Sequence, residues 1–537
     1  MNRRNFVKLT GASLTSLLIP DFMLAEPWNG TTMQMPDRVK IITPAGTFAM
    51  RSTDQHAWQG QDVEVRLKNE KARVAVFVES PATALQEVQL SWKYAIPKHS
   101  KVAGDAWERT YADVSFEMPD ATRKLPWYCV EHNDNATVCF GVKTGCSAFC
   151  YWTVSNNTLT LHLDTRNGSE GVLLGPRILH AADIVTTKNV SSENVFATVS
   201  RFCGMLCEEP RRVEQPVYGI NDWYFAYGNN SARLILEHTA LLAPLALNTT
   251  NRPFSVIDDG WSVGSDYTRA NDKFGDMPKL IKEISNLGMR PGLWTRPLLA
   301  RPNEKSTWLI KGRGQVLDPT IDESREFVCS LFRLYRTWGF ELVKHDYTTF
   351  DIFGRWGKEM NDIMTAPGWH FNDRSKTNAE VILDLYKAIR VASGDMCLIG
   401  CNSISHLSAG LFEVYRTGDD TSGKEWIRTK EMGVNTMGFR MVQHRHFYQV
   451  DGDCVGVTTA IPWEKNKQWM QLLAQSSAPF FISAQTAAVG AEQKAFIKEC
   501  FSQASVNLPI GEPLDWVQNK YPAKWKLNNQ VVEFDWD

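Results

Sequence analysis

Alternating hydrophobic and polar positions run through the first third of the chain. Between about residues 36 and 205, short segments such as VKIITPAGTF, ARVAVFVES and TLTLHLDT place apolar side chains at every second position, and Gly, Asn and Asp residues separate them. A period of two residues is typical of strands with one buried face, because successive side chains point to opposite faces of the sheet. We therefore predict an N-terminal antiparallel β-sandwich domain over residues 26–210.

The pattern changes between Pro210 and Pro216. From there, short apolar runs alternate with helical stretches such as MPKLIKEISNLG and SREFVCSLFRLYRTWG, which end in Gly288 and Gly339 as helices commonly do. This alternation indicates βα units and a parallel sheet. The predicted strands lie at residues 217–225, 253–260, 290–296, 340–347, 395–402, 413–420, 447–453 and 478–484. Eight strands close a TIM barrel, so we predict an α/β fold with a (β/α)8 barrel over 211–505 and a short C-terminal β extension over 506–537.

The first 25 residues have a different character. Arg3 and Arg4 precede Phe6, Lys8 and a weakly apolar run that ends near Ala25, a pattern similar to a twin-arginine export signal. The apolar run is short and interrupted, so we expect cleavage and a mature protein in the periplasm or the medium, with a retained signal anchor as the alternative.

Composition and charge narrow the range of partners. The chain is 43% hydrophobic and 22% charged, which describes a folded protein, and its formal net charge is -2. Nucleic acids and anionic membranes normally require a basic face, so we expect neither as a partner beyond the export step. The 11 Cys are odd in number, so a monomer has at least one free thiol, and their spacing matches no zinc site. No dinucleotide or Walker motif is present either, and we predict no metal and no cofactor.

Charged residues, most of them acidic, end four of the eight predicted strands. They are Asp258 and Asp259, Lys344 and Asp346, Arg416 with Asp419 and Asp420, and Asp451 and Asp453. In a TIM barrel the active site lies at the carboxyl ends of the strands, so these side chains are expected to meet at the barrel mouth. Carboxylates that converge there would repel one another unless the site binds something.

The spacing of these residues indicates which ones share a face. Lys344 and Asp346 are two residues apart on a predicted strand and should both point into the barrel, where the lysine would keep Asp346 ionised. Arg416 and Asp420 also share a parity, whereas Asp419 should point away. Two carboxyl groups about 5 to 5.5 Å apart define a retaining glycosidase, in which one attacks the sugar and the other protonates the leaving oxygen. We predict Asp346 as the nucleophile and Asp420 as the general acid/base.

The order of these motifs resembles a known family. DDGW at 258–261, FGDMPKLIKEISNLGMRPGLWTRP, FELVKHDY, RTGDD, VDGD and LLAQSSAPFFIS follow one another as in the melibiase-like clan of α-galactosidases and α-N-acetylgalactosaminidases. The resemblance covers about residues 215 to 505. It implies a retaining exo-α-glycosidase that cleaves terminal α-linked galactose from an oligosaccharide or glycan.

The resemblance also implies roles for individual residues. Asp346 matches the nucleophile of the family and Asp420 its acid/base, while Asp419 stays the close alternative because some relatives place the acid directly after a small residue. By this resemblance the substrate would be bound by Trp223, Asp258, Asp259, Trp261, Trp294, Lys344, Cys401, Arg416 and Asp419, and we add Asn402, which follows Cys401 on the fifth strand.

The fifth strand departs from the family pattern. It reads GCNSIS, in which Cys401 fits the clan but Asn402 and Ser403 do not. Because this strand reads the substituent at carbon 2 in the clan, the choice between galactose and N-acetylgalactosamine stays open, as does another α-glycosidase or transglycosidase activity. The alternative from a different class is a carbohydrate-binding barrel without catalysis.

Overall fold

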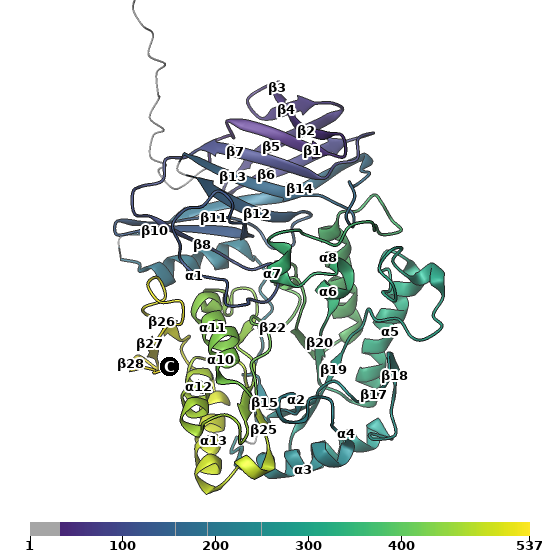
Figure 1. The fold of residues 1–537 in the computed structure, drawn as a ribbon, viewed down its shortest axis with the longest axis vertical. Coiled ribbons are helices and arrows are strands. Elements are labelled where there is room, and N and C mark those ends of the chain that lie inside the picture. Colours follow the sequence, from purple (N-terminus) through teal and green to yellow (C-terminus); the bar gives the residue numbers. More distant parts are fainter. Residues whose placement is uncertain (1–32, 156, 191, 249) are drawn as a thin grey trace, which may run out of the picture.

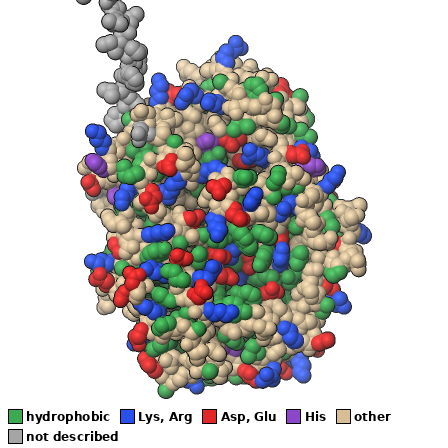
Figure 2. All heavy atoms as spheres, viewed as in Figure 1, with side chains coloured by type: hydrophobic (Ala, Val, Ile, Leu, Met, Phe, Trp, Pro, Cys, Tyr) green, Lys and Arg blue, Asp and Glu red, His purple; other side chains and the backbone are tan. Residues whose placement is uncertain are grey.

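The computed structural model describes residues 33–155, 157–190, 192–248 and 250–537 (Figure 1). The predicted export signal at 1–25 lies outside these ranges. A layered β-structure forms the upper part of the molecule in Figure 1, and strands surrounded by helices form the lower part. Within the described ranges, no helix has the length and apolar character needed to cross a membrane. The face shown in Figure 2 mixes acidic, basic and hydrophobic side chains, in keeping with a net charge near zero.

The N-terminal part is an antiparallel sandwich of two sheets, as predicted. The six-stranded sheet has the order β2 (Gly46–Ala49), β1 (Arg38–Thr43), β7 (Glu87–Lys93), β13 (Thr158–Asp164), β12 (Phe149–Ser155) and β9 (Leu125–Pro126). The eight-stranded sheet has the order β3 (Arg51–Ser52), β4 (Ala57–Gly60), β5 (Val63–Glu70), β6 (Arg73–Ser80), β14 (Gly175–Lys188), β11 (Ala136–Val142), β10 (Tyr128–Asn133) and β8 (Lys101–Gly104). Strand β5 illustrates the period of two, since Val63, Val65 and Leu67 are buried in the core.

The second part is a curled parallel sheet that forms a TIM-like barrel. Its order is β23 (Gln449–Asp451), β22 (Val414–Arg416), β21 (Cys397–Gly400), β20 (Leu342–His345), β19 (Arg290–Thr295), β16 (Phe254–Ile257), β15 (Tyr218–Asn221), β25 (Phe480–Ala484) and β24 (Val455–Val457). All eight predicted strand ranges contain a strand. The ninth, β24, follows β23 after a short break at which Asp453 adopts a φ of 80°. Because β23 pairs with β22 and β24 pairs with β25, the segment 449–457 joins the two edges of the sheet.

Helices connect the strands. They are α1 (Val195–Leu206), α2 (Trp223–Ala226), α3 (Ala232–Leu242), α4 (Met277–Asn286), α5 (Asp322–Trp338), α6 (Thr348–Phe353), α7 (Gly357–Met360), α8 (Asn378–Ser393), α9 (Ser405–Ser408), α10 (Trp426–Arg428), α11 (Asn435–Arg440), α12 (Trp463–Gln475) and α13 (Ala491–Ala504). Helix α5 ends as predicted at Gly339, whose φ of 105° requires glycine. Smaller sheets are formed by β17 (Ser262–Val263) with β18 (Asp266–Ala270), and by β26 (Glu512–Pro513), β27 (Lys524–Leu527) and β28 (Gln530–Glu533).

Hydrophobic side chains fill the interior of the barrel below its mouth. They are Val217, Tyr224, Phe254, Val256, Leu342, Ile399, Val414, Cys454 and Phe481. Since alternate residues of a strand share a face, the next inward positions are Asp258, Lys344, Cys401 and Arg416. A polar layer therefore lies directly above an apolar floor.

The sandwich and the barrel are joined by a long loop of the sandwich. Thr110 forms a parallel bridge with Gly418, just beyond the end of β22. Nearby, the guanidinium group of Arg440 pairs with the carboxylate of Asp105 at 3.1 Å, and both side chains are buried. These contacts place residues 105–117 against the barrel mouth.

His345 lies between the mouth residues Lys344 and Asp346 in sequence but points away from them, into a cluster with the rings of Phe332, Tyr386 and Phe412. All eleven cysteines, from Cys129 to Cys500, are free thiols. Within the described part of the chain, no three His, Cys, Asp or Glu side chains gather in a way that could hold a metal ion.

Candidate active site

A cavity of about 90 Å3 opens at the carboxyl ends of the barrel strands. It is lined by Arg109, Trp223, Asp258, Asp259, Trp294, Lys344, Asp346, Tyr347, Trp356, Asp419 and Asp420. Eight of these eleven residues are among those that the sequence predicted. The structure thus brings together acids from the second, fourth and sixth strands of the barrel, which are far apart along the chain.

Asp346 follows β20 and is held by two hydrogen bonds. The indole N–H of Trp294 donates to Oδ2 at 2.9 Å, and the backbone N–H of Tyr347 donates to Oδ1 at 2.7 Å. Tyr347 has a φ of 65°, in the left-handed region that a tyrosine rarely adopts. This conformation turns the chain sharply directly after Asp346. Asp346 is only 8% exposed, so its orientation is fixed by the protein.

Lys344 has a different partner from the one predicted. Its ammonium group pairs with Oδ2 of Asp258 at 2.8 Å, and Asn221 donates to the same oxygen at 2.7 Å. Burial opposes the charge of Lys344, but Asp258 outweighs it and raises the pKa of Lys344 well above its usual value. Asp259 lies beside this pair, and its pKa is raised by burial and by the negative charges of Asp258 and Asp346.

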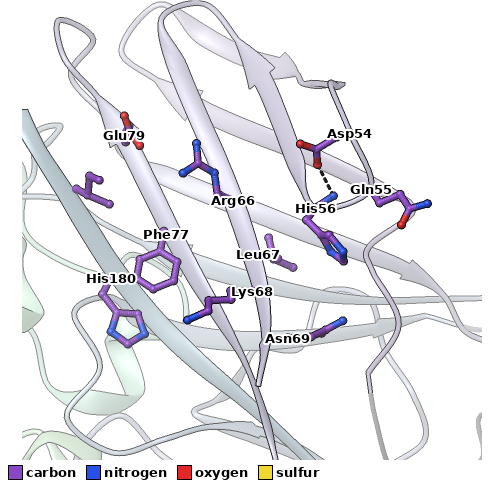
Figure 3. Close-up of a pocket in the computed structure, with 11 residues that line it drawn as sticks. Asp54, Gln55, His56, Arg66, Leu67, Lys68, Asn69, Phe77, Glu79 and His180 are labelled. Atoms are coloured by element: carbon purple, nitrogen blue, oxygen red, sulfur yellow. Dashed lines mark hydrogen bonds between the residues drawn. The ribbon is translucent and has the colours of Figure 1, made fainter. Parts of the chain in front are cut away.

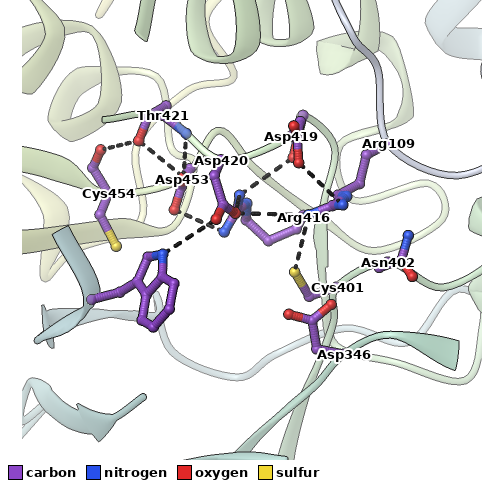
Figure 4. Close-up of polar contacts among 12 residues, drawn as sticks. Arg109, Asp346, Cys401, Asn402, Arg416, Asp419, Asp420, Thr421, Asp453 and Cys454 are labelled. Carbon is purple, nitrogen blue, oxygen red and sulfur yellow. Dashed lines mark hydrogen bonds and ion pairs between the residues drawn. The ribbon is translucent and has the colours of Figure 1, made fainter. Parts of the chain in front are cut away.

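Asp419 and Asp420 lie in a loop rather than on a strand. Strand β22 ends at Arg416, so the prediction from parity that Asp419 points away is wrong, and both carboxylates line the cavity. Figure 4 shows them grouped around the guanidinium groups of Arg109 and Arg416, with Asp346 beside Cys401.

Arginines surround the two neighbouring acids. Asp420 lies 3.1 Å from Arg416 and 3.7 Å from Arg109, and it accepts a hydrogen bond of 3.3 Å from the indole of Trp223. Burial favours the neutral acid, but Arg416 and Arg109 outweigh it and lower the pKa of Asp420 to about 2. Asp419 pairs with Arg109 at 3.1 Å and with Arg428 at 3.0 Å. Because Arg416 and Arg109 stabilise its negative charge, Asp420 is expected to be a carboxylate at neutral pH.

Four predicted substrate-binding residues lie behind the cavity wall instead of lining it. Trp261 is fully buried and donates its indole N–H to the backbone oxygen of Trp294 at 2.9 Å. Cys401 and Asn402 are also fully buried, and the amide of Asn402 donates to the carboxylate of Glu108. Their polar atoms are bonded within the protein or do not reach the cavity. These three side chains therefore support the cavity wall and do not form its surface.

Arg416, the fourth, joins two acids. Its guanidinium group is 2.8 Å from Oδ1 of Asp453. The other oxygen of this carboxylate, Oδ2, accepts hydrogen bonds from the backbone N–H and the hydroxyl of Thr421. Asp453 is therefore satisfied within the protein. Asp451, beside it, is buried, and burial raises its pKa to about 6. Asp453 therefore anchors Arg416, and neither Asp451 nor Asp453 is among the residues that line the cavity.

Three residues of the lining were missed from the sequence. Tyr347 follows Asp346 directly, and its position at a strand end was a signal that could have been used. Trp356 lies between α6 and α7 and stacks on Phe350, with ring centroids 4.5 Å apart. Arg109 comes from the sandwich, and no local pattern marks it.

A larger hollow of about 910 Å3 lies elsewhere, on the outer face of the eight-stranded sheet (Figure 3). Strands β5, β6 and β14 contribute most of its lining, including Arg66, Phe77 and His180. Arg66 pairs with Glu64 and Lys68 with Glu70 of the same sheet, and the rings of Phe77 and His180 stack with their centroids 4.8 Å apart. Of the described residues, only two acids, Asp54 and Glu79, line this hollow, so the barrel cavity with its five carboxylates is the better candidate for chemistry.

Known proteins share this architecture. No family model matches the chain. Among solved structures, it is similar to an α-galactosidase from Thermus thermophilus in complex with p-nitrophenyl α-D-galactopyranoside, with a TM-score of 0.62 and 14% identity over 92% of this chain and 98% of that one. It is also similar to a GH36 α-galactosidase from Geobacillus stearothermophilus in complex with raffinose, with a TM-score of 0.57 and 12% identity over 93% and 80% of the two chains.

The chain has the fold of the GH36 α-galactosidases. A third similar structure is a cycloalternan-degrading enzyme from Trueperella pyogenes, with a TM-score of 0.52 and 11% identity over 94% of this chain and 88% of that one. The same glycoside hydrolase fold therefore occurs in proteins described by different substrates. At these identities, the similarity establishes the architecture but does not identify the sugar that the cavity binds.

Proposed function

We propose that this protein is a retaining exo-α-glycosidase that hydrolyses terminal α-linked galactose. One observation carries the proposal: Asp346 and the neighbouring acids Asp419 and Asp420 line a single cavity at the mouth of a barrel with the GH36 fold. A pair of carboxyl groups that faces one sugar ring is the minimum that double displacement requires. Their convergence from the fourth and sixth strands supports this chemistry.

In the first step, Asp346 attacks the anomeric carbon and the bond to the leaving oxygen breaks. The hydrogen bonds from Trp294 and Tyr347 fix the carboxylate before the substrate arrives, which reduces the cost of reaching the transition state. Asp420 donates a proton to the leaving oxygen. In the second step, Asp420 takes a proton from water, and the water oxygen displaces Asp346 from the anomeric carbon, so the product keeps the α configuration.

The remaining lining suits a neutral sugar. Asp258, Asp259 and Lys344 offer charged hydrogen-bond partners for hydroxyl groups, since a carboxylate accepts and an ammonium group donates. The rings of Trp223 and Trp294 offer apolar surface to the C–H faces of a pyranose. A compact cavity with these groups favours a terminal residue of an oligosaccharide or glycan.

The proposal is tested by labelling and by product analysis. A mechanism-based galactose analogue should label a peptide that contains Asp346, and proton NMR should show α-galactose as the first product from a nitrophenyl α-galactoside. A β-configured first product, or a label on a peptide without Asp346, would overturn the assignment. Parallel assays with nitrophenyl α-N-acetylgalactosaminide separate the two sugars.

A second candidate is another α-glycosidase or transglycosidase with the same fold. The similarity to the cycloalternan-degrading enzyme favours this candidate, because that protein shares the architecture. Turnover of an α-glucoside faster than an α-galactoside would support it. Sugar binding without turnover of any glycoside would instead indicate a binding barrel, and Asp346→Ala would then leave affinity unchanged.

Export is part of the proposal. The first 25 residues suggest transport through the twin-arginine route to the periplasm or the medium. Replacement of Arg3 and Arg4 by Lys should leave the protein in the cytoplasmic fraction, whereas unchanged fractionation would contradict export by this route.

A further inference from the structure

One member of the cavity lining does not belong to the barrel. Arg109 is a residue of the long sandwich loop, and the barrel holds that loop on both sides of it. The backbone N–H of Thr110 donates to the carbonyl oxygen of Thr417 at 2.7 Å, and the carboxylate of Glu108 accepts from the backbone N–H of Gly357 at 2.9 Å. Arg109 itself is only 4% exposed. Its guanidinium group is therefore held in place before any ligand binds.

The two ends of this guanidinium group differ in how well they are bonded. Nη2 pairs with Asp419 at 3.1 Å and donates to the hydroxyl of Tyr111 at 3.4 Å. Among the described residues, the partners of Nη1 are only the thiol sulfur of Cys401 at 3.8 Å and a carboxylate oxygen of Asp420 at 3.7 Å. Both distances of Nη1 exceed those of a good hydrogen bond, so this charged donor has no strong acceptor in the part of the chain that the structure describes.

The charge of the cavity indicates what that acceptor is. The lining contains the five carboxylates Asp258, Asp259, Asp346, Asp419 and Asp420, against the two cations Lys344 and Arg109. An anionic substituent would be repelled by this excess of negative charge. A sugar hydroxyl avoids that repulsion and can accept from Nη1 while it donates to a neighbouring carboxylate.

We propose that Nη1 of Arg109 donates a hydrogen bond to one hydroxyl of the bound sugar, so that a residue of the sandwich helps to select the sugar that the barrel accepts. The proposal rests on the proposed glycosidase function and adds a specificity residue to it. A buried donor discriminates strongly, because a sugar without the matching hydroxyl leaves the donor unpaired.

The test compares Arg109→Met with the wild type on nitrophenyl α-galactosides that lack the hydroxyl at carbon 2, 3, 4 or 6. For one position, the wild type should prefer the parent over the deoxy compound by roughly 10- to 100-fold in kcat/KM, and the variant should lose most of that preference. At the other three positions, both proteins should discriminate equally. Arg109→Lys, which keeps the charge but not the planar fork, should retain part of the preference. A variant that discriminates like the wild type at all four positions overturns the proposal.

Arg123→Met is the matched control. This arginine belongs to the same region of the sandwich and donates to the backbone oxygens of Val102 and Ser115, but it does not line the cavity. It should lower thermal stability and leave the pattern of deoxy discrimination unchanged. If Arg123→Met alters the pattern in the same way as Arg109→Met, the effect is one of loop structure and the proposal fails.

A second readout separates this proposal from the glycosidase function. Arg109 is one of the cations that lower the pKa of Asp420, with Arg416 and Lys344. Arg109→Met should therefore move the pH dependence of kcat/KM to higher pH, which a purely structural loss would not do. If the wild type hydrolyses no galactoside, the function fails, and calorimetric titration with galactose and its deoxy analogues then judges Arg109 by affinity alone. A wild type that binds none of these sugars overturns both proposals.

Discussion

The charge state of Asp420 leads to a prediction about pH and leaving groups. Burial favours the neutral acid, but Arg416 and Arg109 hold the pKa of Asp420 at about 2. Since each pH unit above the pKa lowers the protonated fraction tenfold, only a very small fraction of the molecules carries the proton at pH 7. A general acid works only in its protonated form. The free protein at neutral pH is thus prepared to act as the base of the second step rather than as the acid of the first.

The consequence appears in kcat/KM, which reports the ionisation of the free enzyme. For methyl α-galactoside, whose leaving oxygen needs a proton, kcat/KM should fall about tenfold for each unit between about pH 4 and pH 7. For nitrophenyl α-galactoside, whose leaving group departs without a proton, kcat/KM should not follow this slope. The assay is initial-rate kinetics with both substrates at constant ionic strength.

Asp420→Asn is the decisive variant. It should remove the pH slope and most of the activity on the methyl galactoside, by about 100- to 10,000-fold, while kcat/KM on the nitrophenyl substrate changes little. Because the base of the second step is also lost, nitrophenol should appear in a burst. If kcat/KM for the methyl galactoside is level to pH 7 in the wild type, the reasoning from the arginine contacts is refuted. If Asp419→Asn gives this pattern instead, Asp419 is the acid.

Three further predictions follow from the contacts of the site and the domain interface. Asp346→Ala should lower turnover by several orders of magnitude, because no covalent intermediate can form, and azide should restore it with a β-galactosyl azide as product; absence of rescue would speak against a nucleophile at this position. Trp294→Phe removes the 2.9 Å hydrogen bond to Asp346 and should reduce kcat/KM roughly 10- to 100-fold, whereas an unchanged value would show that the indole N–H is not needed. Arg440→Met leaves Asp105 buried without its cation and should lower the free energy of unfolding by about 3–5 kcal/mol in denaturant titrations, and a smaller loss would mean that the interface relaxes.

Periodicity along the chain was sufficient to predict the layers and the direction of the key side chains. The period of two in β5 puts Val63, Val65 and Leu67 into the sandwich core. By the same period, Lys344 points into the barrel like Leu342, two residues before it, and binds Asp258 above the apolar floor. Such predictions succeed because backbone geometry alone makes alternate side chains of a strand share a face.

The same reasoning failed where the strands ended. β22 stops at Arg416, and the following residues turn against Thr110, so parity no longer applies to Asp419 and Asp420. Lys344 was correctly directed into the barrel, but its partner was misassigned to Asp346. The direction in which a side chain points is a local property of its strand. Its bonding partner depends on where neighbouring strands place their own side chains.

The sequence by itself determined the two kinds of sheet, the order of the barrel strands and the acids at their ends, because each depends on the spacing of residues along a short segment. Only the tertiary structure decided that Arg109 lies beside Asp419 and Asp420, more than three hundred residues away in the chain. It likewise decided that Trp261, Cys401 and Asn402 support the wall instead of forming it. Those outcomes depend on how the sandwich packs on the barrel, and packing across such separations leaves no periodic trace in the sequence.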